Sequence, residues 1–488
     1  MLRVLVCLAL CAASLAQIPL PQRYRAAGEL RWGSDAEGGT PFVFVDPAHP
    51  DKGEVGFEVD LANELGALLA VRMVRVQSPF ANLVQAVQRG DCDLAMNGLE
   101  PTPARRAQAR FTRPYYIFLQ QLSVGPGVDN VRTLADCKGL RIGVLGESLS
   151  HKLAQQQPGV EVVVYESNTT AYEDVINGRT AGSLADLPIA RALHAMFPQL
   201  QHVGEPFHPY YYAIAVRDAE PELQQALDAA IGVLFLNGTL ERIYRKWDMW
   251  VGDEARLGDR DVIEASTGGG SNDLQWGPAM MLLGEGALRT LGISVVSFVL
   301  AVVLGLAIAL ARLYGPTPVR LCAIGYVELL RGTPILVQML LLYYGLGSIK
   351  ALQMSAVKAG ILGLALNYAA YEAEIYRGAL LAIPRGQREA AAALGLTTPQ
   401  SLRHVIVPQA LRLSLAPSTN DFIALFKDSS IVMVITVVEL SKQYLMLANA
   451  SGRYIVLGLV TCGLYLAMSL PLAFFARRFE RMLDRDRA

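Results

Sequence analysis

The sequence predicts a multidomain protein in which a soluble α/β region precedes an all-α transmembrane region of about five helices. The composition is 52% hydrophobic and 18% charged, with a mean hydropathy of +0.31. Soluble chains are usually about 25% charged, so a purely soluble enzyme and a disordered scaffold are both excluded. The average is nevertheless too polar for membrane spans throughout. The net charge of −1 gives no reason to expect nucleic acid binding.

The first residues read as a signal peptide. Arg3 precedes an apolar run, and Ser14-Leu15-Ala16 offers small residues for cleavage near Ala16. The alternative is an uncleaved anchor helix, although the apolar run is short for a span. We therefore expect residues 1–16 to be a signal peptide.

Residues 17–250 alternate strand-like apolar runs with helical patterns, which is typical of mostly parallel sheets. Helical periodicity appears over Phe57–Ala70 and, with breaks, over Pro221–Trp250. The predicted strands are Leu30–Gly33, Val71–Val76, Cys92–Asn97, Leu140–Leu145 and Glu161–Tyr165. Residues 251–275 then become charged and Gly/Ser-rich, which predicts a flexible linker.

The remainder of the chain, 276–488, carries the membrane segments. A span needs about 20 apolar residues to cross the hydrocarbon core. The five predicted spans are Leu291–Ala311, Gly332–Ile349, Val357–Tyr376, Ser414–Leu440 and Tyr454–Ala476. Arginines concentrate on one side of this alternation, which predicts that this side is cytoplasmic and that the α/β region is outside. The signal peptide independently predicts the same orientation.

Cysteines and nucleotide motifs add little chemistry. Cys92 and Cys137 both lie in the exported region, where either a disulfide or two separate buried thiols are consistent with the sequence. No metal-ligand spacing appears. The chain contains no G-x-x-x-x-G-K-[ST] motif, so we expect no cofactor on this chain.

One cytoplasmic segment has a specific pattern. Glu389-Ala390-Ala391 is followed by Gly395 and Pro408. This resembles the EAA loop of ABC importer permeases, and flanking segments such as Ala370–Gly378 and Lys427–Ser430 resemble the polar amino acid subfamily. An Ala-rich helix permits close approach, Gly395 makes a turn, and a second helix is expected to follow until Pro408. The resemblance implies that an ATPase subunit, carrying ATP and Mg²⁺, docks here.

Three charged residues are predicted at membrane depth, where each costs about 2.5–3.5 kcal/mol on insertion scales. They are Glu374, Lys427 and Asp428. Either they line a translocation path, or they form helix-packing pairs or lie at the interface, since Glu374 is close to Arg377.

Residues 27–250 resemble the periplasmic solute-binding proteins of the polar amino acid family, a bilobed α/β fold. The resemblance is carried by Gly56–Leu61, Gly90–Asp93, Thr102–Arg105, Phe111–Tyr116 and Lys246-Trp247. An amino acid presents a carboxylate, which favours Arg, and an ammonium, which favours Asp or Glu. The resemblance implies a substrate site of Asp35, Phe80, Gly98, Glu100, Arg105, Ser148 and Asp186.

Each of these residues has an expected role. Arg105 matches the carboxylate-binding arginine, with Arg106 as the alternative register, and Asp186 matches the ammonium ligand. Ser148 opens a helix and Gly98 allows close backbone approach. Phe80 either packs on the ligand or belongs to the core, and Asp35 either meets a side-chain donor or caps a turn. For Arg105, the alternative is a surface ion pair. Glu100 departs from the family's Ser or Thr, and either binds the ammonium or points away.

Together these features predict the binding and membrane-spanning subunit of an ATP-driven ABC importer in the plasma (inner) membrane. This chain performs no covalent chemistry. The expected partners are a polar amino acid, with glutamine, histidine and arginine left open, an ATPase subunit, a second copy of this chain and the bilayer. An amino-acid-gated ion channel and an amino-acid-sensing receptor are the alternatives. The continuous binding region and the absence of a TVGYG-like filter argue against the channel.

Overall fold

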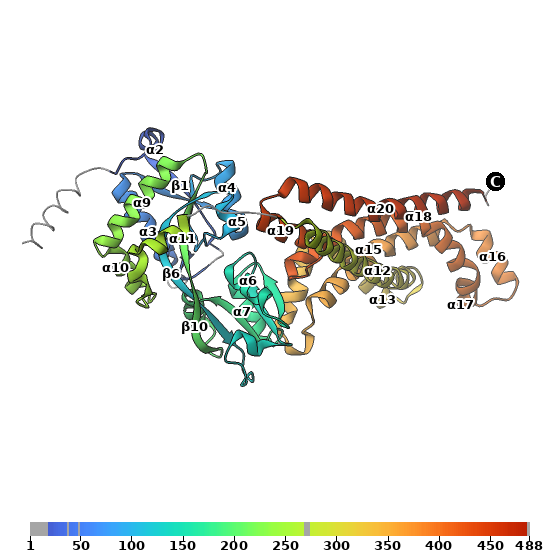
Figure 1. Cartoon of the computed structure of the whole chain (residues 1–488). Helices are drawn as coiled ribbons and strands as arrows, with labels where there is room; N and C mark the ends of the chain where they lie inside the picture. Colours follow the sequence, from blue (N-terminus) through green and yellow to red (C-terminus); the bar gives the residue numbers. More distant parts are fainter. Residues whose placement is uncertain (1–17, 37–38, 47–48, 268–273, 486–488) are drawn as a thin grey trace, which may run out of the picture. The chain divides into compact units, whose positions relative to one another are not determined.

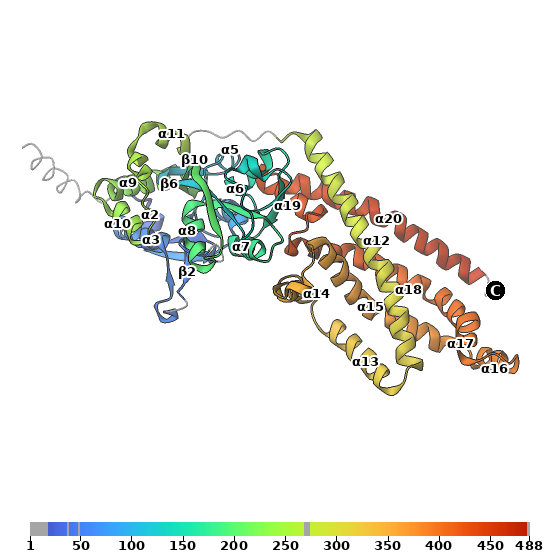
Figure 2. The ribbon, with the colours of Figure 1, turned by 90° about the horizontal axis from the view of Figure 1, so that it is seen from below.

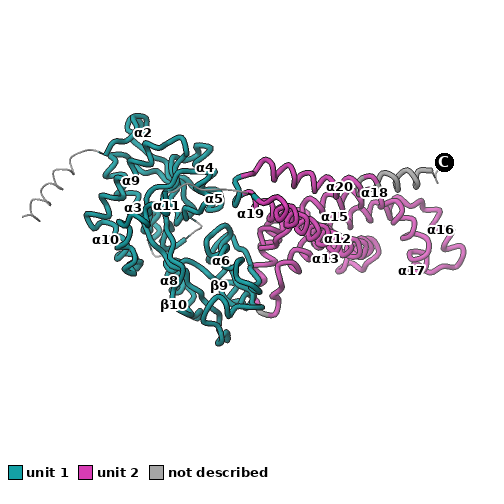
Figure 3. Tube along the Cα trace, in the orientation of Figure 1, with its two compact units in different colours: residues 1–274, 449–452 teal, residues 275–448, 453–488 magenta. Residues whose placement is uncertain are grey.

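The computed structural model describes residues 18–485 except 37–38, 47–48 and 268–273. The predicted signal peptide, 1–16, lies outside the described residues. The chain divides into two compact units, Met1–Leu274 with Asn449–Gly452 (unit 1) and Gln275–Ala448 with Arg453–Ala488 (unit 2), as Figure 3 shows.

Unit 1 is an α/β domain in which the five predicted runs correspond to β1, β4, β5, β7 and β8. Parallel pairing joins β1 to β4 and β5, and β7 to β8 and β9. The strands are β1 (Glu29–Ser34), β2 (Phe44–Val45), β3 (Glu54–Val55), β4 (Arg72–Gln77), β5 (Leu94–Ala95), β6 (Arg110–Val124), β7 (Arg141–Leu145), β8 (Glu161–Tyr165), β9 (Gly182–Asp186) and β10 (Gln201–Val216). The pairing order is β4-β1-β5-β10-β6-β9-β7-β8.

Two long antiparallel strands divide unit 1 into lobes. β6 and β10 pair along most of their length. One end of β10 pairs with β5, whereas the far end of β6 pairs with β9. We call the part around β1, β4 and β5 lobe 1, and the part around β7, β8 and β9 lobe 2. Figure 1 shows β6 and β10 passing between them.

Helices flank these strands. Periodic apolar positions predict α3 (Phe57–Leu69), and Gly238, in the left-handed conformation, separates α9 (Pro221–Leu236) from α10 (Thr239–Lys246). The others are α2 (Gln22–Ala27), α4 (Leu83–Arg89), α5 (Pro103–Arg106), α6 (Leu149–Gln156), α7 (Asn168–Ile176) and α8 (Leu187–Met196), with short 3₁₀ turns at Pro50–Lys52, Phe80–Asn82 and Leu134–Cys137.

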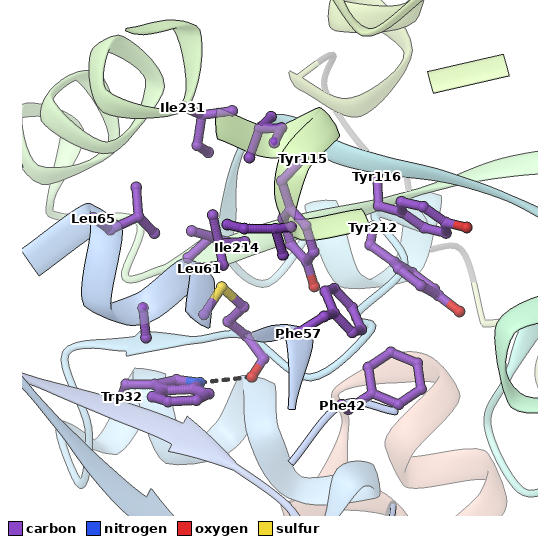
Figure 4. Close-up of a cluster of buried hydrophobic side chains, with 14 of the residues drawn as sticks. Trp32, Phe42, Phe57, Leu61, Leu65, Tyr115, Tyr116, Tyr212, Ile214 and Ile231 are labelled. Carbon is purple, nitrogen blue, oxygen red and sulfur yellow. Dashed lines mark hydrogen bonds between the residues drawn. The ribbon is translucent and has the colours of Figure 1, made fainter. Parts of the chain in front are cut away.

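Aromatic rings fill the core of unit 1 where the long strands cross. Tyr212 stacks between Phe118 and Tyr116, with ring centroids 4.2 and 5.7 Å away. Figure 4 shows Tyr116 and Tyr212 beside Phe57 and Phe42. Such ring pairs add about 0.5–1.5 kcal/mol beyond their buried area, so this stack holds the Tyr212 side chain in one position.

The segment after residue 250 differs from the flexible linker that we expected. Residues Asp253–Gly258 form a 3₁₀ segment and Arg260–Thr267 form α11. Leu257 and Val262 are buried in the core of unit 1, and the Ser266 hydroxyl donates to the Thr112 carbonyl over 3.0 Å. Spacings of four and five residues place these side chains on one side of the segment, and their burial overrides the charged composition around them.

Unit 2 is helical. Its longest contact joins α12 (Trp276–Tyr314) and α15 (Ala356–Ala382), which run side by side in Figure 2. A Cβ at Gly305 would lie 2.5 Å from the Glu372 Cβ, so a small residue is needed for this close approach. The other segments are α13 (Thr317–Gly332), α14 (Ile335–Leu340), a π turn (Leu341–Gly345), α16 (Arg385–Ala393), α17 (Thr398–Ser401), a π turn (Leu402–Ile406), α18 (Val407–Asp428), α19 (Leu440–Ser451) and α20 (Tyr454–Arg485), with 3₁₀ turns at Leu346–Ser348, Lys350–Leu352 and Ser429–Ile435.

The count of five spans is not confirmed. Within the described residues, two helices are long and apolar enough to cross a membrane, Trp276–Tyr314 and Tyr454–Pro471. A third span is present if α13 and the helix after it form one bent span. That pair bends by 108° around Thr333-Pro334. The predicted span Ser414–Leu440 is not one helix, because α18 ends at Asp428 and Thr436 adopts a left-handed conformation.

Candidate functional site

Lobe 1 and lobe 2 enclose a polar cavity of ≈ 30 Å³. Six of the predicted site residues line it, four from lobe 1 and two from lobe 2: Asp35, Phe80, Gly98 and Glu100, and Ser148 and Asp186. Arg105 lies behind Glu100. The tertiary structure therefore brings together residues that are far apart in the chain, such as Asp35 and Asp186.

Asp186 ends β9 and is held by two donors. Gln120 Nε2 donates to Oδ1 over 2.6 Å, and the Tyr212 hydroxyl donates to Oδ2. Burial, followed by the nearby Glu100 carboxylate, raises the pKa of Asp186 to about 7. A cation placed beside Asp186 would offset both effects, so this carboxylate is a candidate ammonium ligand.

Gly98 has both features that require glycine. Its φ is +61°, and a Cβ there would lie 2.6 Å from Cε1 of Phe42. Its N–H donates over 2.7 Å to the buried carboxylate of Glu58, which also accepts the Tyr115 hydroxyl. Burial raises the pKa of Glu58 to about 7. Gly98 thus lets Phe42 reach the cavity wall.

Arg105 and Glu100 form a buried ion pair across the edge of the cavity. Arg105 Nη1 contacts Glu100 Oε2, and Arg105 Nη2 donates to the Glu147 carbonyl over 3.1 Å. The other Glu100 oxygen accepts the Leu149 N–H over 3.0 Å. Arg105 is only 9% exposed, so the surface-pair alternative does not describe it, and Glu100 does not point away.

Phe80 and Asp35 are linked to each other. The Phe80 N–H donates to Asp35 Oδ2 over 2.8 Å, and Gln77 donates to Oδ1 over 2.9 Å. Asp35 therefore caps the turn that carries Phe80, which is one of the two roles considered for it. The Phe80 ring is half-buried and lies 5.1 Å from the Arg105 guanidinium carbon, a cation–π distance.

Ser148 is the N-cap of α6. Its oxygen accepts the His151 N–H over 3.2 Å, and its hydroxyl donates to the Leu145 carbonyl over 2.8 Å. This cap aims the first N–H groups of α6 at the cavity, where the Leu149 N–H meets Glu100.

Several cavity residues were not identified from the sequence. They are Phe42, Asn97, Ser150, Glu166 and Asn168. Asn97 precedes Gly98, and Ser150 follows the α6 cap, so proximity to predicted residues was the available signal. Glu166 and Asn168 follow β8, and only the fold brings the carboxyl end of that strand to the cavity.

The three charged residues of unit 2 have different surroundings. Glu374 pairs with Arg312 and, over 2.7 Å, with Arg377, which is the helix-packing arrangement. Asp428 accepts the Tyr368 hydroxyl over 2.7 Å, and Lys427 lines a second cavity of ≈ 350 Å³. Sequence reasoning missed Glu372, which is fully buried and accepts the Ser418 hydroxyl over 2.8 Å.

The segment that resembles an EAA loop is an exposed helix–turn–helix. Glu389, Ala390 and Gly395 are exposed, whereas Ala391 is buried. Gly395 has φ +78° and makes the expected turn. The second helix does not end at Pro408, contrary to our expectation. A π turn over Leu402–Ile406 precedes Pro408 in the first turn of α18, where its missing N–H is tolerated.

Cys92 and Cys137 are both buried free thiols in the structure. The reading of two separate thiols is therefore the correct one. Burial raises the pKa of each to about 11, so neither is a reactive thiolate at neutral pH.

A two-lobed domain with a polar interlobe cavity, joined to a helical membrane unit, defines a solute-binding transport protein. Two family models match this chain: bacterial extracellular solute-binding proteins, family 3, over 30–249, and the binding-protein-dependent transport system inner membrane component over 301–485. The chain belongs to the amino acid permeases of these ABC transport systems, with its solute-binding domain in the same polypeptide. The predicted resemblance is confirmed.

Curated relatives match the permease part. The glutamine transport system permease protein GlnP of Escherichia coli K12 is 39% identical over 207 residues, covering 42% of this chain and 94% of GlnP. The arginine transport system permease protein ArtQ of Bacillus subtilis is 32% identical over 206 residues, covering 42% and 94%. Among solved structures, an ancestral arginine-binding protein bound to arginine is 31% identical, with a TM-score of 0.43, covering 45% of this chain and 98% of that protein.

Proposed function

We propose that this chain captures a polar amino acid of the glutamine, histidine or arginine type and conducts it inward through an ATP-driven importer. The observation that carries the proposal is the convergence of Asp186, Gly98, Ser148 and the Arg105–Glu100 pair on one interlobe cavity, in a chain whose other half is a permease. The names of relatives, glutamine and arginine permeases, support this substrate class.

The roles follow from charge. Asp186 receives the ligand's ammonium, and Phe80 packs on its side chain. Asp35 acts through the turn that carries Phe80, because both of its carboxylate oxygens accept hydrogen bonds from that region. A cavity of ≈ 30 Å³ holds water-sized molecules, so an amino acid enters when the lobes separate about β6 and β10, a hinge motion.

The driving force comes from a partner. An ATPase subunit carrying ATP and Mg²⁺ docks on the exposed loop of Glu389, Ala390, Ala391, Gly395 and Pro408, and this chain holds no cofactor. Two copies of unit 2 form the pore in the inner membrane, with unit 1 on the periplasmic side. Asp428 and Lys427 belong to the translocation path, whereas Glu374, paired with two arginines, holds helices together.

The test is reconstitution of the full chain with a candidate ATPase in proteoliposomes. Each of the twenty amino acids is added in turn, and ATP hydrolysis and uptake are measured. We expect one polar amino acid to stimulate both. If no amino acid stimulates hydrolysis and no ATPase co-purifies, the proposal is wrong, and an ion channel or a sensing receptor becomes the better description.

A matched pair of variants tests the site. Asp186→Asn removes a charge-assisted contact worth about 1.5–3 kcal/mol, and should raise the half-maximal amino acid concentration roughly 10- to 150-fold. Asp218→Asn is the control, because that side chain is 80% exposed. Equal affinities of the two variants would contradict the role of Asp186.

A further inference from the structure

Glu100 makes the contacts that a bound carboxylate would need. It is 1% exposed, and its two oxygens are divided between Arg105 Nη1 and the Leu149 N–H at the start of α6. A guanidinium and a helix N-terminus are the protein groups best suited to an anion. Because Arg105 belongs to lobe 1 and α6 to lobe 2, this single carboxylate joins the two lobes.

Both terminal nitrogens of Arg105 already have partners. Nη1 meets Glu100, and Nη2 donates to the Glu147 carbonyl over 3.1 Å. The carboxylate of an incoming amino acid that used these same donors, Arg105 Nη1 and the Leu149 N–H, would displace Glu100 from both. It would then leave Glu100 as a second negative charge in a buried site, which is costly.

The charge of the cavity wall points the same way. Among the described residues that line the cavity, the charged ones are all acids: Asp35, Glu100, Glu166 and Asp186. Two cations are close to this wall: Arg105 pairs with Glu100, and the charges of Glu100 and Glu147 act on the Lys152 ammonium. Asp186, whose hydrogen-bond donors Gln120 and Tyr212 are uncharged, is the carboxylate on which a cation would rest.

We propose that Glu100 is an internal substitute for the ligand's carboxylate, so that the cavity takes cationic amines without an α-carboxylate at least as tightly as the corresponding amino acids. The ligand class is an amine with a second cationic group, either guanidinium, imidazolium or ammonium. This inference rests on the proposed function, namely that the interlobe cavity binds the transported solute. It adds that Glu100 sets the relative affinity of the cavity for an amine and for the corresponding amino acid.

Pairs of ligands that differ only in the carboxylate provide the test. Binding of arginine and agmatine, histidine and histamine, and lysine and cadaverine is measured by calorimetry on the full chain in lipid nanodiscs. For the tightest pair, we expect the wild type to bind the amine with equal or higher affinity. In Glu100→Gln, the ratio of amine to amino acid affinity should shift at least tenfold towards the amino acid.

Two further variants separate charge from position. Glu166→Gln removes one acid from the same wall without touching Arg105, so it should weaken both members of a pair equally and leave their ratio unchanged. Glu100→Ser, with a hydroxyl in place of the carboxylate, should shift the ratio in the same direction as Glu100→Gln and confirms the result if one variant folds poorly.

The outcomes are distinct. A wild type that binds the amino acid at least tenfold more tightly, or a ratio that changes less than threefold in both Glu100 variants, overturns this inference while leaving amino acid import intact. If none of the pairs binds and no amino acid stimulates transport, the proposed function fails as well.

Discussion

Replacing Gly98 by alanine tests the physical basis of the cavity wall. The position has φ +61°, and an added Cβ would lie 2.6 Å from Cε1 and 3.0 Å from Cζ of Phe42. The Phe42 ring cannot withdraw easily, because it packs against Phe57 at 5.2 Å and Tyr212 at 5.7 Å between ring centroids. Gly98→Ala therefore combines backbone strain with overpacking.

Gly178→Ala separates the two contributions. Gly178 has φ +71°, but no heavy atom lies within 4 Å of its added Cβ. A left-handed alanine costs about 1–2 kcal/mol in both variants, whereas forcing a methyl group into a packed core adds about 1–3 kcal/mol only at Gly98. In a domain of about 150–250 residues, each kcal/mol lowers Tm by about 2–4 °C. Gly98→Ala should consequently melt about 2–12 °C below Gly178→Ala.

Intrinsic fluorescence of the full chain in nanodiscs is a suitable assay. Trp32, Trp247 and Trp250 all belong to unit 1, and only Trp276 belongs to unit 2, so the melting signal reports mainly on unit 1. Equal Tm values for the two variants would refute the argument, because they would show that Phe42 makes room for the methyl group without cost.

Three further predictions concern other parts of the molecule. The pKa of Glu58 is raised from 4.5 to about 7, so the folded state binds a proton more tightly than the unfolded state, and the free energy of unfolding should fall as pH rises from 4.5 to 7. Glu58→Gln should make this fall smaller in melting curves recorded at different pH values, and an unchanged pH dependence would contradict the prediction. Arg312→Ala removes one of the two arginines that pair with Glu374, so it should lower the Tm of unit 2, and adding Glu374→Gln should recover part of the loss. Strictly additive losses of Tm in this double-mutant cycle would argue against the Arg312–Glu374 pair. Glu389 is exposed on α16, so Glu389→Ala should change the free energy of unfolding by only about 0.5 kcal/mol and leave solute affinity within about twofold of the wild type. It should nevertheless reduce amino-acid-stimulated ATP hydrolysis, and full stimulation would refute a coupling role for Glu389.

Local patterns predicted several elements of unit 1, including half of its strands. The strand over Glu161–Tyr165 and the helix that begins at Phe57 follow directly from apolar periodicity. The long strands β6 and β10 were not predicted. β6 is buried along nearly its whole length, whereas β10 is largely exposed near Gln201 and buried near Val216, so neither shows the alternation of a half-buried strand. A strand that changes environment shows no single period in its sequence.

The membrane unit was predicted less completely. Long uncharged runs are visible in any sequence, so α12 and α20 were located correctly. The bend at Thr333-Pro334 and the end of α18 at Asp428 were not predicted. Both leave polar groups that need hydrogen-bond partners from other helices, such as the Tyr368 hydroxyl for Asp428, and these partners are distant in the sequence.

The sequence, through its resemblance to known families, was sufficient to indicate the kind of protein, an amino acid permease with its own binding domain, since the motifs and apolar runs that carry the resemblance are local properties of the chain. It also selected Arg105, Glu100 and Asp186 as candidate ligands. Only the tertiary structure decided how these charges are partnered. Glu100 meets Arg105 and α6, and Asp186 meets Tyr212 and Gln120, because packing of the two lobes sets distances between residues that are far apart in the chain. The pairing of a buried charge depends on those distances, and no pattern of neighbouring residues encodes them.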